Sequence, residues 1–181
     1  METQGKLFLC PTPIGNLGDI TYRTLETLKS VDLIAAEDTR NTLKLLNHFD
    51  IKAPLISYHE HNKKESGAKI LARLLRGESC ALVTDAGMPA ISDPGEDLVR
   101  LAAERGVRVL IVPGSCAAVS ALALSGLSTG RFCFEGFLTM NKIGRREHLE
   151  SLKNETRTMI FYEAPHKLRD TLSAMYSVTV F

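Results

Sequence analysis

The feature that most constrains this chain is the segment Ala81–Gly95, which reads ALVTDAGMPAISDPG. A short apolar run stops at Thr84 and Asp85, and small residues, two prolines and a second aspartate follow. This pattern is typical of a buried strand that ends in a small-residue loop at its carboxyl end, where open α/β sheets bind ligands. Small residues let the backbone approach a ligand closely, and prolines hold the loop in shape without one. The segment therefore predicts a loop that binds through main-chain atoms.

Strand-like and helix-like segments alternate over the first part of the chain. Strands are expected at Leu7–Cys10, Asp32–Ala36, Pro54–Ser57, Cys80–Thr84 and Arg108–Val112. The helices between them are expected at Thr21–Ser30 (capped by Asp19), around Leu43–Phe49, around Ile70–Leu75 and at Glu96–Arg105. Strict alternation of strands and helices predicts an α/β fold, with a mostly parallel sheet and helices on both of its faces.

The pattern changes after Val112, and this change predicts a second domain. Residues 1–115 are expected to form an N-terminal α/β domain, and residues 116–181 the start of a C-terminal α/β domain. In the second part we expect a small-residue helix after Cys116, strands from Phe132 and at Thr158–Tyr162, and a helix from Pro165.

Composition excludes several classes of protein. With 181 residues, of which 44% are hydrophobic, the chain can bury a sizeable core. The formal charge of +1 excludes a polybasic tail, so a nucleic-acid partner has to be recognised by shape and local contacts. The four cysteines are widely spaced, which favours reduced thiols and a cytoplasmic protein. No segment is long and apolar enough to predict a membrane span.

Common catalytic and metal motifs are missing. The first loop reads PTPIGNLGD and not G-x-G-x-x-G, and there is no Walker-type lysine loop, no G-x-S-x-G and no H-E-x-x-H. The sequence His59-Glu60-His61 has metal-ligand chemistry but lies in a polar stretch before two lysines. A solvated or substrate-facing turn is the better interpretation, and no metal is expected.

Five segments in order resemble the tetrapyrrole-methylase-fold proteins and, within them, the ribosomal RNA small subunit methyltransferase I group. They are LFLCPTPIGNLGDITYRTLETL, DLIAAEDTR, SYHEHN, TDAGMPAISDPG, and the pair RFCFEGFL and FYEAPHKL. The resemblance implies a two-domain fold of this kind. Family members continue well past Pro165-His166, so the resemblance also implies a C-terminally truncated chain with an incomplete second domain. The last residues, MYSVTVF, do not match the family.

The resemblance implies S-adenosylmethionine as the methyl donor, bound in a cleft between two α/β domains. Backbone groups can bind its adenine, its sulfonium and its amino-acid part. The implied binding residues are Pro13, Gly15, Asp85, Ala86, Gly87, Met88, Ile91, Ser115, Cys116, Ala117, Phe137, Tyr162 and Glu163. Ser115–Ala117 precede a predicted helix, whose free N–H groups suit a carboxylate. Purely structural roles stay open: Pro13 and Gly15 could shape a turn, and Asp85 could cap the helix that follows.

The implied reaction is methylation of a cytidine ribose 2′-oxygen in the decoding region of small-subunit ribosomal RNA. A neutral hydroxyl is a poor nucleophile, so a base would help. The candidates are Glu37, Asp38, His59, Glu135, Glu163 and His166, and no spacing singles out one of them. Structural alternatives are a helix cap for Asp38 and an ion pair of Glu37 with Arg40.

The expected partner is small-subunit RNA in the assembled subunit. Arg40, Lys142, Arg145 and Arg146 are the candidate RNA-binding residues, with Asn141–Arg146 expected on a loop. The resemblance also implies a homodimer at full family length, and neither DNA nor membrane is expected as a partner.

Two other functions remain open at this point. A methylase of a tetrapyrrole or corrinoid precursor would share the fold and the methyl donor, but the chain has no Trp and only 6% aromatic residues to line a wide apolar mouth. A non-catalytic fragment that binds S-adenosylmethionine or RNA is the second alternative.

We expect Asp85→Ala to lower the affinity for S-adenosylmethionine more than Asp38→Ala does. The reason is that Asp85 begins the loop predicted to bind the methyl donor. Titration calorimetry on the two variants measures this difference. Equal affinities would remove the reason for centring the site on Asp85–Met88.

Overall fold

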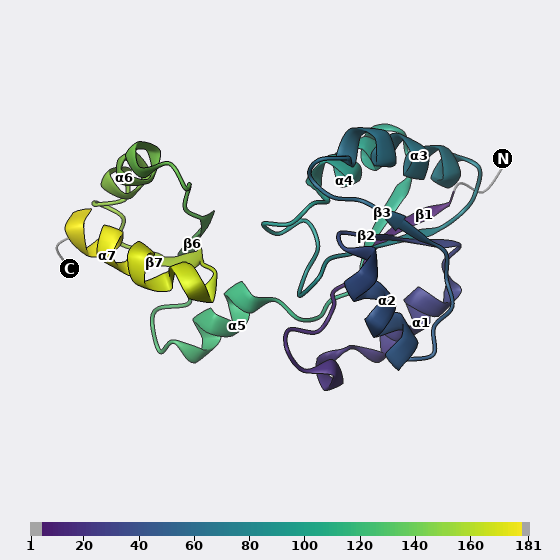
Figure 1. The fold of residues 1–181 in the computed structure, drawn as a ribbon, viewed down its shortest axis with the longest axis horizontal. Helices are drawn as coiled ribbons and strands as arrows, with labels where there is room; N and C mark the ends of the chain where they lie inside the picture. The colour runs from purple at the N-terminus through teal and green to yellow at the C-terminus, as the bar shows by residue number, and fades with distance from the viewer. Residues whose placement is uncertain (1–4, 179–181) are drawn as a thin grey trace. The chain divides into compact units, whose positions relative to one another are not determined.

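The computed structural model describes residues 5–178 and divides into two compact units. The first unit ends at Ala117 and the second begins at Ala118. Each unit is built around its own parallel sheet (Figure 1).

The sheet of the first unit has the strand order β3-β2-β4-β1-β5. Its strands are β1 (Lys6–Leu9), β2 (Leu33–Ala36), β3 (Leu55–Ser57), β4 (Cys80–Val83) and β5 (Arg108–Ile111). All neighbouring strands pair in parallel, with Leu9 opposite both Leu82 of β4 and Ile111 of β5. Every carboxyl end therefore lies at the same edge of the sheet. The five strands match the sequence prediction to within one or two residues at each end.

Helices cover both faces of this sheet (Figure 1). The helices α1 (Tyr22–Ser30) and α2 (Thr39–His48) lie on one face, and α3 (Lys63–Leu75) and α4 (Glu96–Glu104) lie on the other. Two separate apolar clusters fill the space between helices and sheet, one containing Leu28 and Leu46 and the other Ile70 and Leu98. The central strands β2 and β4 are buried at every position. The predicted α/β fold with helices on both faces is confirmed.

The strand order creates a crevice on each side of β4. The chain moves in one direction across the sheet from β1 to β3 and returns through β4 to β5, so the helices change faces after β3. The loop after β4 therefore leads to one face, while the loops after its neighbours β1 and β2 lead to the other. Open α/β sheets bind ligands in crevices of this kind, outside the carboxyl ends of the strands.

Side-chain caps begin the two helices α1 and α2. Thr21 is the cap of α1, where its hydroxyl accepts a hydrogen bond from the Thr24 N–H at 3.0 Å. Asp19 was expected in that role, but it lies in the short 3-10 turn Leu17–Asp19 before the helix. Asp38 caps α2 by accepting a hydrogen bond from the Arg40 N–H. This is the structural alternative that the sequence offered for Asp38.

The second unit contains α5 (which starts at Ala117), a two-stranded parallel sheet and two more helices. The elements are α5 (Ala117–Leu124), β6 (Phe132–Phe137), α6 (Lys142–Ser151), β7 (Thr158–Tyr162), the 3-10 turn Pro165–Lys167 and α7 (Leu168–Val178). The expected loop at Asn141–Arg146 is wrong, because α6 begins at Lys142. Asn141 caps that helix and accepts hydrogen bonds from the N–H groups of Ile143 and Gly144.

Two further observations concern the whole described chain. Within residues 5–178, no helix is long and apolar enough to cross a membrane. The last three residues of the tail MYSVTVF lie outside the described residues.

We expect Gly114→Ala to lower the free energy of unfolding by about 1–3 kcal/mol, the range seen when a packed site is overfilled. A Cβ at Gly114 would lie 2.5 Å from Pro11 Cγ and 3.4 Å from Thr21 Cγ2. Gly130→Ala is the control, because a Cβ there meets nothing within 4 Å. Urea unfolding of both variants measures the difference, and equal stabilities would contradict this packing.

Candidate functional site

The loops after β1 and β4 are joined at the carboxyl edge of the first sheet by an antiparallel bridge. The Thr12 N–H donates to the Gly87 carbonyl at 2.9 Å, and the Gly87 N–H donates to the Thr12 carbonyl at 3.0 Å. The Thr12 hydroxyl adds a third bond, to the Thr84 carbonyl at 2.9 Å. The loop predicted to bind a ligand is therefore fixed to the first strand's loop.

The loop after β5 packs against both of these loops. Gly114 lies so close to Pro11 that no side chain fits between them. A Cβ at Gly87 would meet Ile14 at 3.3 Å and the Ser115 carbonyl oxygen at 3.8 Å. Three loops far apart in sequence thus meet at one crevice, and they bring Pro13, Gly15, Asp85–Met88 and Ser115 to the same edge of the sheet.

The loop Asp85–Gly95 has an unusual backbone. Ala90 and Ser92 have φ values of 67° and 59°, in the left-handed region that residues with side chains seldom adopt. Gly95 has a φ of 153°, and a Cβ there would lie 2.9 Å from both Ala90 and Leu82. Strained conformations of this kind gather at functional sites and persist where the surroundings fix them.

Backbone donors are left free at the start of this loop. Among the described residues, no hydrogen bond is made by the backbone N–H groups of Asp85, Ala86 and Met88. Asp85 and Ala86 are exposed and Met88 is half-buried. Free N–H groups in a fixed loop can bind a carboxylate or the polar edge of a ring.

A cavity of about 410 Å³ opens beside these loops, toward α2. Of the predicted binding residues, Pro13, Gly15 and Asp85 line it. Sequence reasoning missed the α2 side of the cavity, where Asn41, Lys44, Leu45 and His48 line the wall. Their spacing of three, four and seven residues places them on one face of a helix, which is the signal that could have found them.

The carboxylates at this edge have different partners. Asp85 accepts a hydrogen bond from the Asn41 amide at 2.9 Å, which joins the loop to α2. Glu37 accepts one from the Thr84 hydroxyl at 2.8 Å. The alternative ion pair between Glu37 and Arg40 is wrong, because Arg40 pairs with Asp38 through two of its nitrogens. Asp38 is thereby a cap and an Arg40 partner.

Asp93 is a titratable group that sequence reasoning did not place among the candidates. It is half-buried, and its pKa is raised from 3.8 to about 6, mainly by burial. The negative charges of Glu37 and Asp85 contribute to this rise, while the Thr84 hydroxyl acts in the opposite direction. A carboxyl group of this pKa can take up or release a proton near neutral pH.

His59 follows the edge strand β3. Its Nδ1 atom is buried and has no hydrogen-bond partner among the described residues. Its ring contacts the His61 ring edge-to-face, with centroids 5.9 Å apart. No group of three or more possible metal ligands occurs in residues 5–178, so these two histidines stand without a third ligand.

The predicted residues of the second unit gather around β7. Tyr162 contacts the Phe137 ring with centroids 5.5 Å apart, and its hydroxyl accepts a hydrogen bond from the Ala118 N–H at 3.1 Å. Glu163 accepts hydrogen bonds from the Thr171 hydroxyl at 2.6 Å and from the Ala164 N–H at 2.7 Å. These bonds lower the pKa of Glu163, so this carboxylate holds the turn after β7 and is a weak base.

The other candidates of this unit lie apart from that cluster. Glu135 contacts the His148 ring at 2.9 Å, and His166 lies in the exposed 3-10 turn before α7. Lys142 and Arg146 are exposed on α6, where they line a shallow hollow, and Arg146 also pairs with Glu150 at 2.8 Å. Arg145 is half-buried.

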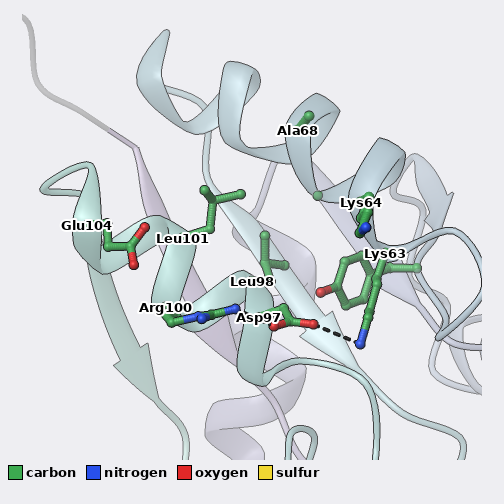
Figure 2. Close-up of a pocket in the computed structure, with 10 residues that line it drawn as sticks. Lys63, Lys64, Ala68, Asp97, Leu98, Arg100, Leu101 and Glu104 are labelled. Atoms are coloured by element: carbon green, nitrogen blue, oxygen red, sulfur yellow. Dashed lines mark hydrogen bonds and ion pairs between the residues drawn. The ribbon is translucent and has the colours of Figure 1, made fainter.

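A second cavity of the first unit, of about 510 Å³, lies between α3 and α4 (Figure 2). Leu98 and Leu101 form its apolar wall, and charged side chains of both signs surround it. Lys63 pairs with Asp97 at 2.9 Å across the opening (Figure 2). Sequence reasoning assigned no site here, and opposite charges that neutralise one another give the groove no preference for one class of ligand.

Within residues 5–178, none of the four cysteines forms a disulfide. Cys10 and Cys80 are buried in the first unit, and burial raises the pKa of each thiol to about 12. These two side chains therefore stay uncharged and pack as small apolar groups.

The stability of the protein should depend on pH through Asp93. Because folding raises the pKa of this carboxyl, its protonated form stabilises the fold below pH 4, and that stabilisation is lost as the pH rises through about 6. Asp93→Asn, which cannot ionise, should exceed the wild type in unfolding free energy by about 1–3 kcal/mol at pH 8 and by much less at pH 4.

Urea unfolding at several pH values measures this difference. Glu78→Gln is the matched control with the opposite sign, since Arg73 lowers the pKa of Glu78. A gap between Asp93→Asn and wild type that does not change with pH would contradict the raised pKa.

Comparison with solved structures supports the architecture. The chain superposes on a cobalt precorrin-4 methyltransferase with a TM-score of 0.69 and 19% identity, covering 96% of this chain and 74% of that one. A diphthine synthase superposes with a TM-score of 0.67 and 14% identity, covering 95% of this chain and 72% of that one. At these identities the likeness concerns the fold.

Proteins found by sequence comparison share far more identical residues with this chain than these two solved structures do. The chain is 52% identical over 177 residues to "Ribosomal RNA small subunit methyltransferase I" of Escherichia coli O157:H7, covering 98% of this chain and 62% of the relative. It is 53% identical over 174 residues to the protein of the same name from Bacillus subtilis (strain 168), covering 96% of this chain and 60% of the relative. The chain thus spans about three fifths of the length of these relatives, and the resemblance seen in its motifs is confirmed. Residues 6–178 match the family "Tetrapyrrole (Corrin/Porphyrin) Methylases", and the chain belongs to that family.

Proposed function

We propose that this chain is the methyl-donor-binding part of a methyltransferase that acts on the RNA of the small ribosomal subunit. The observation that carries the proposal is the identity of about one residue in two with relatives of that name, over nearly the whole chain. The crevice beside β4 supports the methyl-donor half of the proposal, because its loops are fixed before any ligand is bound.

The residues at this crevice fit S-adenosylmethionine. The free N–H groups of Asp85, Ala86 and Met88 suit the carboxylate and the ring edges of that molecule. Gly87 leaves open the space that a side chain would take beside Ile14 and Ser115. Pro13 and Gly15 would hold the donor from the first loop, and Ile91, Cys116 and Ala117 would complete the contacts. In the second unit, Phe137, Tyr162 and Glu163 are the proposed further contacts.

S-adenosylmethionine, when bound, supplies an electrophilic methyl group. The chain's own task is to hold the acceptor hydroxyl in line with that group and to receive its proton. Asp93 is the best-suited base at this edge, because its pKa of about 6 leaves it ionised at neutral pH yet more basic than an ordinary carboxylate. Asp38 forms an ion pair with Arg40, and Glu163 accepts a hydrogen bond from Thr171. Both carboxylates are therefore weaker bases than Asp93.

We further propose that the acceptor is the 2′-oxygen of a cytidine ribose in the decoding region, presented by the assembled subunit. Lys142 and Arg146 on α6 suit phosphate contacts, which position RNA without reading its sequence. Arg40 offers a further contact from the first unit, where its side chain is 86% exposed despite its pairing with Asp38. A homodimer at the relatives' full length and a cytoplasmic location belong to the same proposal.

The test is transfer of labelled methyl from S-adenosylmethionine to small subunits that lack the modification. Wild-type chain should place label on a cytidine ribose, and the rate should rise with pH through about 6. Asp93→Asn should reduce the rate about 100-fold or more and abolish that rise, as expected on loss of a general base. Asp50→Asn is the control, since Asp50 is exposed before β3, at the opposite edge of the sheet.

Other outcomes would replace the proposal. Binding of the donor without any transfer by the 181-residue chain, rescued in a protein of the relatives' full length, would make this chain a binding fragment. A spectral change and transfer with a corrinoid or porphyrin precursor, without transfer to RNA, would instead make it a tetrapyrrole methylase.

A further inference from the structure

Thr12 is a buried polar residue whose surroundings are unusual. Its side chain is almost completely shielded from solvent, with 3% of the residue exposed. It stands between Pro11 and Pro13, neither of which has an N–H to donate. Thr12 therefore carries the only backbone donor of this three-residue stretch.

The pairing of β1 with β4 explains what Thr12 does. Leu9 lies opposite Leu82, and the Cys10 N–H donates to the Leu82 carbonyl at 2.9 Å. A continued parallel ladder would place the Thr12 N–H against the Thr84 carbonyl. Instead, the Thr12 hydroxyl donates a hydrogen bond to the Thr84 carbonyl at 2.9 Å, and the Thr12 N–H donates to the Gly87 carbonyl.

The two ends of a short loop segment are thus held by one residue. The side chain of Thr12 fixes the segment at Thr84, and its backbone fixes it at Gly87 through two bonds of 2.9 and 3.0 Å. Asp85 and Ala86 lie between these points with their N–H groups free. Both residues are exposed, so their N–H groups, which make no bond within the loop, are available to a ligand.

We propose that Thr12 is a positioning residue, whose hydroxyl keeps the Asp85–Met88 loop ready to bind the methyl donor. This inference rests on the proposed function, because it takes that loop as the donor's binding surface. Holding a loop in its bound shape removes the cost of ordering it when the ligand arrives, so the effect appears in affinity.

The test compares three variants of the full chain. Thr12→Val keeps the shape of the side chain and removes only the hydroxyl, whereas Thr12→Ser keeps the hydroxyl. Thr27→Val is the matched control, because Thr27 is also buried and its hydroxyl also donates to a backbone carbonyl, that of Arg23 at 2.8 Å within α1.

Two measurements separate positioning from general stability. Calorimetry with S-adenosylmethionine should show a Kd about 10-fold higher for Thr12→Val, and values within 2-fold of wild type for Thr12→Ser and Thr27→Val. Hydrogen exchange of the Gly87 amide, measured without ligand, should be at least 10-fold faster in Thr12→Val only. Thermal unfolding should show similar losses for the two valine variants.

The result that overturns the inference is wild-type exchange at Gly87 together with wild-type affinity in Thr12→Val. Equal loss of affinity in Thr12→Val and Thr27→Val would overturn it as well, because it would trace the effect to stability. Faster exchange at Gly87 in a chain whose wild type does not bind the donor would support the positioning role and overturn the proposed function instead.

Discussion

The parallel pairing of β4 with both β1 and β2 is the constraint on which the rest of the first unit depends. Because the chain reverses its direction across the sheet before β4, the loop after this strand leaves toward one face, and the loops after its neighbours β1 and β2 leave toward the other. Both crevices beside β4 follow from that reversal. Glu37, Thr84 and Asp93 meet at one of them, and the bridge between Thr12 and Gly87 closes the base of the other.

Much of the fold could be predicted, because it follows from local pattern. The strand Cys80–Val83 is a continuous apolar run bounded by a turn, and the helices on both faces follow from strict alternation. One error occurred where two neighbouring residues could perform the same task. Asp19 and Thr21 can both cap α1, and the choice depends on which of them leaves the chain extended at the helix start. A second error was the loop expected at Asn141–Arg146, where α6 begins at Lys142 with Asn141 as its cap.

The loops that form the site could be predicted from the sequence, whereas the protonation behaviour of its side chains could not. Small residues and prolines identify the Asp85–Gly95 segment, since few other roles require them together. The environment of Asp93 could not be read from the sequence, because its raised pKa comes from burial and from Glu37, which follows a different strand, β2. The wall formed by Asn41 and His48 depends in the same way on which face of α2 turns toward Asp85.

The position of β1 also has a consequence for how the protein is made. β1 begins at Lys6, but its two partners are β4 and β5, so Leu9 pairs with Leu82 and with Ile111. Contacts between residues so distant in sequence form slowly, because a long loop has to close before they contribute any stability. During synthesis the first strand therefore has no partner until β4 has left the ribosome, and it gains its second partner only when β5 follows near the end of the first unit. The charged Lys6 and the prolines after Cys10 are suited to that interval, since both disfavour pairing with strands of other chains.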